Sequence, residues 1–287
     1  MKCDGRHSPT RWQTKLANLR YRLRWKLARR VKVIDRDQTL RFICNSAMEE
    51  YRAQTFFVKE EGTINWIREH VRPGDSFLDI GANIGLYTLA AAQRVGAGGV
   101  VYAVEPHIVN FQSLLRNIAA NNFQDRVRPF SCALHEASGI FDFNYRSLDP
   151  GSSMSQLNAT RDGEENEFGP VTVEAKLAVT VDHLIAAGSM QPPCHVKIDV
   201  DGNEMLILKG MRELLTGHNA PRTMQVEINA RYRDALFAFL KEVGFELVET
   251  HHTLNGKSMI ASGMNPNEIA HNAIFRPSQA HVARRAA

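Results

Sequence analysis

Residues 77–89 read FLDIGANIGLYTL and join a short apolar run to a second apolar stretch of a different period. The run that ends at Ile80 has the length of a buried strand, whereas the residues from Leu86 onward repeat as they do in a helix. Gly81 and Gly85 lie between the two segments. A strand that turns through glycines into a helix is typical of a ligand site, because a helix N-terminus presents backbone N–H groups without partners.

The spacing of this turn indicates which ligand it suits. A dinucleotide motif would read GxGxxG, but Asn83 replaces the middle glycine and disfavours the close approach of a diphosphate. No GK[ST] follows, so the turn is not a P-loop. Glu105 ends the next apolar run, twenty residues after Gly85, where an acid can accept both ribose hydroxyl protons. A nucleoside and a small carboxylate without a diphosphate describe S-adenosyl-L-methionine.

The rest of the chain alternates apolar runs with segments of helical period. Strands are predicted at residues 76–80, 99–105, 126–134, 139–147, 171–180, 194–200, 223–229, 245–250 and 272–277. Helices are predicted at residues 63–71, 84–95, 107–122, 203–215 and 231–244. Such alternation predicts a doubly wound α/β fold with ligands at the carboxyl ends of its strands. The polar segment 148–170 is predicted to be a long surface loop, part of which could cover an acceptor.

The N-terminal segment is strongly basic. The first 45 residues carry thirteen Lys and Arg against three Asp, a local balance of +10 in a chain whose formal net charge is +4. Apolar residues recur at helical spacing between the basic ones, which predicts a basic amphipathic helix. These apolar residues are Trp12, Leu16, Leu19, Leu23 and Leu27. The helix could dock on the domain through its leucines, or residues 11–32 could contact an anionic membrane surface. No base-reading motif follows, so no specific nucleic acid is expected.

We therefore predict three parts: a basic amphipathic N-terminal arm at 1–50, a cofactor-binding domain at 51–278 and a C-terminal tail at 279–287. No run of about 18 uncharged apolar residues exists, so no transmembrane helix is expected. The start of the chain lacks the apolar core of a signal peptide. The four cysteines are scattered and suit a reducing compartment. These features predict a cytoplasmic protein, with peripheral membrane contact through the arm as an addition.

Three blocks of the sequence, in order and at natural spacing, resemble the FkbM-type family of S-adenosylmethionine-dependent methyltransferases. The blocks are FLDIGANIGLYTL (77–89), GVVYAVEPHIVNFQSLLRNIAANN (99–122) and VKIDVDGNEMLILKGMRELL (196–215). The resemblance covers about residues 60–250. It implies a class I methyltransferase fold, with a Rossmann-like, mostly parallel seven-stranded sheet and helices on both faces. It also implies S-adenosyl-L-methionine as cofactor and, commonly, O-methylation of hydroxyls on sugars or related natural products.

The resemblance assigns the cofactor site residue by residue. The cofactor turn is matched by Asp79, Gly81, Ala82, Asn83 and Gly85, the ribose acid by Glu105, and the region that touches adenine by Cys132 and Ala133. Asp199 lies in the block KIDVDG. Asp201 stands where members of the family usually carry Glu, a change that keeps the charge and shortens its reach.

Methyl transfer to oxygen requires alignment of the reactants and removal of the hydroxyl proton by a base. A central parallel strand should be apolar on both faces, so charged residues in the predicted strand 194–200 need partners or a function. Asp199 is the last polar group before the turn at Gly202, and we predict it to be the base or a group that orients the acceptor. Lys197 would support Asp199, or act as the base itself if burial lowers its pKa. The alternative is a buried structural pair.

Other polar residues near the predicted strand ends give weaker signals. Glu227 could pair with Asp199 to hold a divalent ion, with Asn229 nearby, but these are few ligands for an oxygen cage and no metal is predicted. His251 and His252 are adjacent, so they point in different directions. One of them could contact the acceptor, although a solvent-facing loop is the simpler interpretation.

The residues and the resemblance together predict an enzyme that transfers a methyl group in line to a hydroxyl of a sugar, glycolipid or related natural product. Its partner would be a small-molecule or glycan acceptor. The alternative is a cofactor-binding or membrane-docked protein without turnover, which the joint presence of Asp79, Glu105 and Asp199 disfavours. A nicotinamide-dependent oxidoreductase on the same sheet is disfavoured by Asn83.

Overall fold

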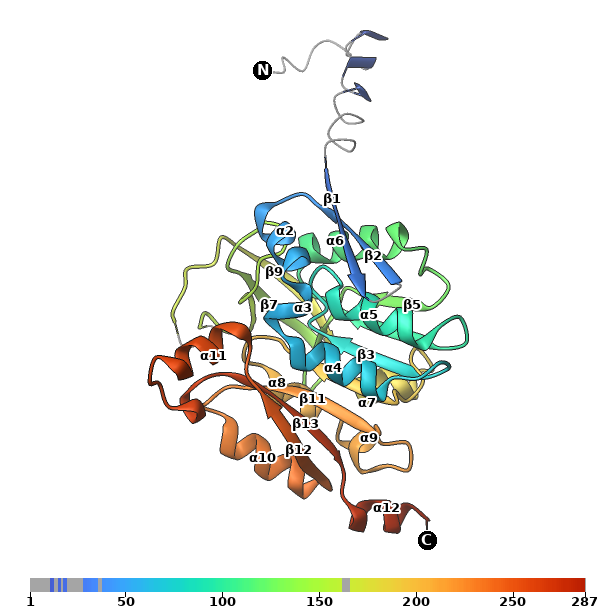
Figure 1. Ribbon diagram of the computed structural model, residues 1–287, viewed down its shortest axis with the longest axis vertical. Coiled ribbons are helices and arrows are strands. Elements are labelled where there is room, and N and C mark those ends of the chain that lie inside the picture. The colour runs from blue at the N-terminus through green and yellow to red at the C-terminus, as the bar shows by residue number, and fades with distance from the viewer. Residues whose placement is uncertain are drawn as a thin grey trace.

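The centre of this computed structural model, which describes residues 11–12, 15–16, 18–19, 28–35, 38–161 and 166–286, is a seven-stranded sheet (Figure 1). In spatial order its strands are β12 (Phe245–His251), β13 (His271–Pro277), β11 (Thr223–Ile228), β10 (His195–Ile198), β3 (Ser76–Ile80), β4 (Val100–Val104) and β5 (Val127–Phe130). Strand β13 runs antiparallel to both of its neighbours, and the other pairs in this sheet are parallel. This order, with one reversed strand next to the edge, confirms the predicted class I methyltransferase fold.

Helices cover both faces of the sheet. One face carries α4 (Glu61–His70), α5 (Leu86–Val95) and α6 (Ile108–Ala120), and the other carries α7 (Val181–Ala186), α8 (Glu204–Lys209), α9 (Arg212–Thr216) and α10 (Arg233–Glu242). Two apolar cores result, because successive strand residues point to opposite faces. Phe77 packs into the first core and Leu78 into the second. The predicted helix 203–215 is in fact two helices, α8 and α9, separated at residues 210–211. A Cβ atom at Gly210 would lie 2.2 Å from the His135 carbonyl oxygen, so this position requires glycine.

A second, four-stranded sheet lies beside the first. Its strands, in spatial order, are β6 (Ala133–Leu134), β9 (Thr172–Val179), β7 (Gly139–Tyr145) and β8 (Gln156–Leu157). The single strand predicted at 126–134 is therefore wrong. Strand β5 is the edge of the central sheet, and after Phe130 the chain leaves that edge to pair with β9. The segment 148–170 is also not wholly a surface loop, because β8 and Gly151 are buried.

Residues 29–50 of the predicted N-terminal arm belong to strands and a helix that pack on the domain. Strands β1 (Arg29–Asp35) and β2 (Gln38–Cys44) form an antiparallel hairpin against α6, followed by α2 (Ala47–Gln54) and α3 (Phe56–Lys59). The side-chain oxygens of Asn117 and Asn121 on α6 each accept a 2.8 Å hydrogen bond from a backbone N–H of β2. A helix can therefore not continue through residue 29. The described residues between 11 and 19 are helical and exposed, and Leu23 and Leu27 lie outside the described residues.

The C-terminal part ends in ordered structure rather than in a tail. Helix α11 (Leu254–Ala261) and a short 3₁₀ helix, η1 (Pro266–Glu268), precede β13, and α12 (Gln279–Ala286) follows it. His281 of α12 is buried, and its ring lies 6.1 Å from that of Phe245. The predicted tail thus begins as a docked helix. None of the helices in the described part of the chain combines the length and the apolar character that a membrane crossing requires.

Candidate active site

A cavity opens at the carboxyl edge of the central sheet, where β3, β4, β10 and β11 end. Residues from these strand ends that line it are Gly81, Ala82, Asn83, Glu105, Pro106, His107, Lys197, Asp199, Val200, Asp201 and Glu227. The segment 52–60 and the loop 152–155 contribute the opposite walls. Doubly wound sheets bind their ligands at this edge, so the cavity lies where the sequence predicted a ligand.

The turn after β3 requires glycine at its first position. Gly81 has a φ of +81°, and a Cβ atom there would lie 1.8 Å from the backbone oxygen of Asp199. Gly85, with a φ of +91°, would place a Cβ 2.7 Å from Leu114 on α6. The two glycines therefore let the turn pack tightly between β10 and α6. Gly81, Ala82 and Asn83 line the cavity, whereas Gly85 does not.

The backbone N–H groups of this turn are already satisfied within the protein. Those of Gly81 and Ala82 both donate to the Val104 carbonyl at 3.0 Å, and that of Gly85 donates to the Ala82 carbonyl at 2.8 Å. The N–H of Asn83 donates to Glu105 at 2.6 Å. The expectation that free N–H groups of the turn bind a carboxylate is therefore wrong for residues 81–83 and 85. Cationic side chains on the facing wall, Arg52 and Lys59, are the available alternatives.

Glu105 lies at the end of β4 with its carboxylate at the cavity wall. Its two oxygens accept hydrogen bonds from the N–H groups of Asn83 and His107, at 2.6 and 2.8 Å. Burial raises the pKa of Glu105 to about 7, although these two hydrogen bonds act to lower it. Each carboxylate oxygen has a second lone pair, so Glu105 can still accept hydrogen bonds from two hydroxyl groups.

The structure separates the residues expected to bind the cofactor into two groups. Four of them, Gly81, Ala82, Asn83 and Glu105, line the cavity, whereas Asp79, Gly85, Cys132 and Ala133 do not. Asp79 lies beneath the turn, where it accepts a 2.6 Å hydrogen bond from Thr88. Ala133 has left the central sheet with β6. Phe143 of β7 occupies the cavity wall beside His107 instead, and no local pattern in the sequence marks it.

Lys197 is buried and forms an ion pair with Asp199, whose side chain is 26% exposed at the cavity. The Lys197 side chain is 1% exposed, and its Nζ lies 3.0 Å from Asp199 Oδ2 and 3.8 Å from Asp79 Oδ1. The ammonium also lies 5.0 Å from the centre of the Tyr87 ring. Burial acts to lower the pKa of Lys197, but the two carboxylates raise it above its usual value. Lys197 therefore stays protonated, which argues against it as the base.

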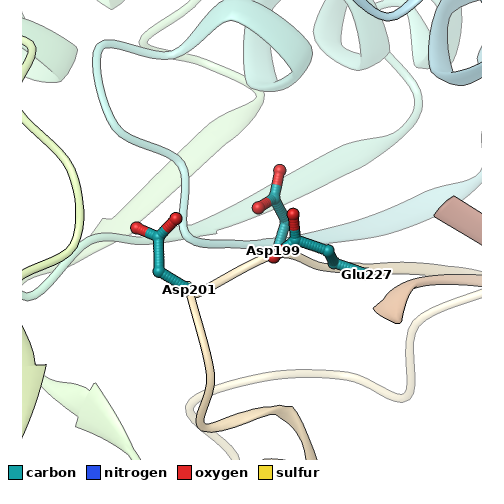
Figure 2. Close-up of side chains that lie close together, drawn as sticks. All are labelled: Asp199, Asp201 and Glu227. Atoms are coloured by element: carbon teal, nitrogen blue, oxygen red, sulfur yellow. The ribbon is translucent and has the colours of Figure 1, made fainter. Parts of the chain in front are cut away.

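Three carboxylates meet at the cavity floor. Asp199, Asp201 and Glu227 each offer one oxygen, and these oxygens lie within 4.8 Å of one another, on the same side of the strand ends (Figure 2). Burial acts to raise the pKa of Asp199, but Lys197 lowers it below its usual value. Burial and the neighbouring Asp199 raise the pKa of both Asp201 and Glu227. Three oxygens are close enough for one cation but fall short of a full oxygen cage, so we assign no metal.

The loop 152–156 is fixed to this floor by hydrogen bonds. The backbone N–H of Met154 donates to Asp201 Oδ2 at 2.7 Å, and Gln156 Nε2 donates to the Asp201 carbonyl at 2.8 Å. On the opposite side, Asn83 Nδ2 donates to the Ser152 carbonyl at 3.0 Å. The sequence left the role of Asp201 open. In the structure Asp201, at a φ of +60°, connects the loop to the end of β10.

The adjacent histidines lie near the cavity without lining it. His251 packs against Gly62, where a Cβ atom would lie 2.3 Å from the imidazole, and burial lowers its pKa. The His252 ring lies 5.2 Å from that of His271. His251 ends β12, so a loop is wrong for His251, and both side chains are half-buried. Thr253, which follows them, does reach the cavity.

Comparison of this chain with known proteins finds similarity to methyltransferases. Hexuronic acid methyltransferase AglP of Haloferax volcanii is 27% identical over 179 residues, which cover 62% of this chain and 67% of that protein. The 31-O-demethyl-FK506 methyltransferase FkbM of Streptomyces tacrolimicus is 27% identical over 212 residues, covering 62% of this chain and 75% of that protein. A crystallised rRNA methylase from Streptococcus thermophilus superposes with a TM-score of 0.44 and 11% identity, over 77% of this chain and 97% of that one.

The family model for the methyltransferase FkbM domain matches residues 79–247, from Asp79 near the end of β3 to the start of β12. This match includes Glu105, Lys197, Asp199 and Glu227, and thus the cavity floor described above. The chain therefore belongs to the FkbM methyltransferase family and is an enzyme that takes its methyl group from S-adenosyl-L-methionine.

Proposed function

We propose that the protein methylates a hydroxyl oxygen of a sugar, a glycolipid or a related natural product. The observation that carries the proposal is the shared cavity, in which the turn after β3 and Glu105 face Asp199 and Glu227. The relatives support an oxygen acceptor, since one is named for hexuronic acid and the other for the 31-O-demethyl form of FK506. Glu105, on one side of the cavity, suits the ribose of the methyl donor. The carboxylates on the other side suit an acceptor hydroxyl.

The residues of the cavity fit the methyl donor, which supplies an activated methyl group on a sulfonium. Glu105 would accept hydrogen bonds from the ribose hydroxyls through its second lone pairs. Arg52 and Lys59 would bind the amino-acid carboxylate, because the N–H groups of the turn have protein partners. His107 and Phe143, whose rings lie 6.5 Å apart, would contact the adenine ring of the cofactor in place of Cys132 and Ala133.

The carboxylates of the floor divide the chemistry between them. Asp199, held ionised by Lys197, would orient the acceptor hydroxyl rather than remove its proton, because a lowered pKa makes a weak base. Glu227 lines the same cavity, and burial and the charge of Asp199 raise its pKa well above its usual value. Glu227 would accept the hydroxyl proton as the oxygen bonds to the methyl carbon and the carbon–sulfur bond breaks.

The experiment is a pH–rate profile of methyl transfer from labelled S-adenosyl-L-methionine to hydroxylated acceptors, with product analysis by mass spectrometry. Glu227→Gln should slow transfer roughly 10²-fold or more and remove the acid limb, because only the carboxylate accepts a proton. Asp199→Asn should shift the acid limb to lower pH, because it removes a charge that raises the pKa of Glu227. Glu136→Gln, an exposed surface change, is the control. A normal rate in Glu227→Gln would contradict the role of Glu227, and methyl transfer to nitrogen or carbon would contradict the proposal itself.

The N-terminal helix supports a proposal about location. Trp12, Leu16 and Leu19 are exposed, and the Lys15 ammonium lies 5.9 Å from the Trp12 ring. We propose a cytoplasmic protein whose residues 11–32 contact anionic membrane surfaces. Removal of residues 1–27, which leaves the β1–β2 hairpin intact, should abolish pelleting with phosphatidylserine vesicles. Pelleting that persists without these residues would contradict the contact.

A further inference from the structure

A buried lysine of the second sheet lies behind the cavity wall that contains Phe143. The side chain of Lys176, on β9, is 5% exposed, and its Nζ lies 2.7 Å from Glu174 Oε1. Lys176 does not line the donor cavity, and no step of the proposed methyl transfer uses it. Because an ammonium is costly to remove from water, a lysine buried in this place needs partners that compensate its charge.

The register of the second sheet places this ion pair on the same face as the aromatic residues of β7. Lys176 lies directly opposite Phe141, and Glu174 lies directly opposite Phe143. Tyr145 shares this face, because alternate residues of a strand point to the same side. The Lys176 ammonium lies 5.7 Å from the centre of the Phe143 ring, within the range of a cation–π contact. Phe143 therefore contacts the buried cation and also lines the donor cavity.

Tyr145 connects the ion pair to His107. The Tyr145 hydroxyl donates to Glu174 and accepts a 3.4 Å hydrogen bond from the backbone N–H of Ile108, the residue after His107. The Tyr145 ring lies 4.7 Å from the His107 ring and 4.9 Å from the Phe143 ring, in both cases edge to face. Aromatic pairs at such distances and angles stabilise each other's orientation. The ion pair and the three rings thus form one continuous set of contacts that ends at the cavity wall.

Both ring nitrogens of His107 have partners within the protein. Nε2 donates to the Ser147 carbonyl at 2.8 Å, and Nδ1 accepts a 3.4 Å hydrogen bond from the Asn110 backbone N–H. Burial lowers the pKa of His107, so its ring is neutral at pH 7, with the proton on Nε2. The ring therefore contacts a base through its carbon atoms and its π face, and such a contact depends on how the ring is oriented.

We propose that Lys176, Glu174 and Tyr145 are positioning residues that hold the rings of His107 and Phe143 against the adenine of the methyl donor. This role rests on the proposed function, which places the adenine at these two rings. The ion pair fixes the Tyr145 hydroxyl, the Tyr145 ring orients His107, and the ammonium orients Phe143. Because all three residues act through the adenine, they contribute to the affinity for ligands that carry this base and not to the affinity for ligands that lack it.

The test compares two ligands that differ in the base. S-adenosylhomocysteine and S-ribosylhomocysteine, which lacks the adenine, are titrated against the full chain by calorimetry. Lys176→Met and Tyr145→Phe should each weaken S-adenosylhomocysteine binding about three- to tenfold, the range for one aromatic contact, and leave S-ribosylhomocysteine binding unchanged. Tyr102→Phe is the matched control, because Tyr102 is also buried and its hydroxyl accepts a 3.0 Å hydrogen bond from the Gln191 N–H outside the cavity.

A double-mutant cycle gives a second measurement that a loss of stability alone would not reproduce. Phe143→Leu should weaken S-adenosylhomocysteine binding, and adding Lys176→Met to it should cost less than Lys176→Met costs in the native chain, because one of the two rings that Lys176 orients is then absent. Strictly additive losses would contradict the coupling. Circular dichroism verifies that each variant is folded, and Tyr145→Phe, which removes a single oxygen atom, tests the same network if Lys176→Met does not fold.

The outcomes separate this inference from the proposed function. Equal weakening of both ligands in Lys176→Met and Tyr145→Phe, or an S-adenosylhomocysteine affinity that neither variant changes, overturns the positioning role. If Phe143→Leu also leaves this affinity unchanged, the adenine does not lie at this wall, and its placement in the proposed function fails with the inference. Selective loss of S-adenosylhomocysteine binding together with methyl transfer to nitrogen or carbon supports the inference and counts against the proposed function.

Discussion

Replacing Lys197 with methionine tests whether the buried ammonium holds the candidate site together. Methionine has a similar length and no charge, so the variant leaves the carboxylates at 3.0 and 3.8 Å, Asp199 and Asp79, without their shared cation. Removal of one partner from a buried ion pair costs about 3–5 kcal/mol, because the remaining charge is left uncompensated in a poorly solvated site. We expect the free energy of unfolding to fall by about this amount at pH 7.5.

The loss should depend on pH, with a sign that follows from the pKa of Asp199. Burial acts to raise this pKa, but Lys197 lowers it below the ordinary value of 3.8. In the native protein the ionised Asp199 therefore contributes stability above pH 3.8, and this contribution is lost as the pH falls through the lowered pKa. In Lys197→Met burial raises the pKa of Asp199, so the fold is penalised more as the pH rises. The two proteins should therefore differ more at pH 7.5 than at pH 5.

Urea denaturation followed by circular dichroism measures both effects. Lys209→Met is the matched control, because Lys209 pairs with Glu136 at 3.2 Å while both side chains are 40% exposed or more. An exposed pair of this kind contributes about 1 kcal/mol or less. If Lys197→Met loses no more stability than the control, or loses the same amount at both pH values, the reasoning about the buried ion pair is refuted.

Two further changes test the donor side of the cavity. Gly81→Ala should prevent S-adenosylhomocysteine binding and lower the free energy of unfolding by clearly more than Gly74→Ala. Gly74 has a φ of +86° but nothing within 4 Å of a Cβ, whereas a Cβ at Gly81 meets the Asp199 carbonyl. Similar losses in the two variants, measured by urea denaturation, would contradict the clash. Since the pKa of Glu105 is raised to about 7, cofactor affinity should rise with pH up to about 7 and proton release should accompany binding. Calorimetry in buffers of different ionisation enthalpy measures this release, and a pH dependence that survives in Glu105→Gln would remove Glu105 from the ribose site.

The parts of the fold that could be predicted are those determined by local sequence. Strand β3, the turn at Gly81 and helix α5 follow one another within twenty residues, and the period of the apolar residues changes at the glycine. The position of Glu105 at the cavity could be predicted for the same reason, because Glu105 ends the next apolar run. These elements assemble from neighbouring segments of the chain, so the sequence alone specifies both the element and the edge of the sheet at which it ends.

The parts that could not be predicted depend on partners distant in the sequence. Residues 133–134 read as a continuation of β5, but their partner is β9, more than forty residues later. The hairpin of β1 and β2 depends on Asn117 and Asn121, which lie more than seventy residues later in the sequence. Their side-chain oxygens accept hydrogen bonds from backbone N–H groups of β2. No period in residues 29–44 reveals those partners, whereas the preceding basic segment has a strong helical period that extends into them.

The protonation of the cavity floor could not be predicted from residue type alone. Asp199 is predicted to be the base or a group that orients the acceptor, because it is the last polar group of its strand. In the structure Lys197, two residues earlier, lowers the pKa of Asp199. Glu227 is also a carboxylic acid, but its neighbour on the adjacent strand is the negatively charged Asp199. That charge and burial raise the pKa of Glu227. Because these groups come from adjacent strands, the ion pair that lowers the pKa of Asp199 also keeps Asp199 charged, and this charge raises the pKa of Glu227. The pairing of β10 with β11 thus sets the pKa of Asp199 and the pKa of Glu227 apart, and the sequence of either strand alone does not contain that information.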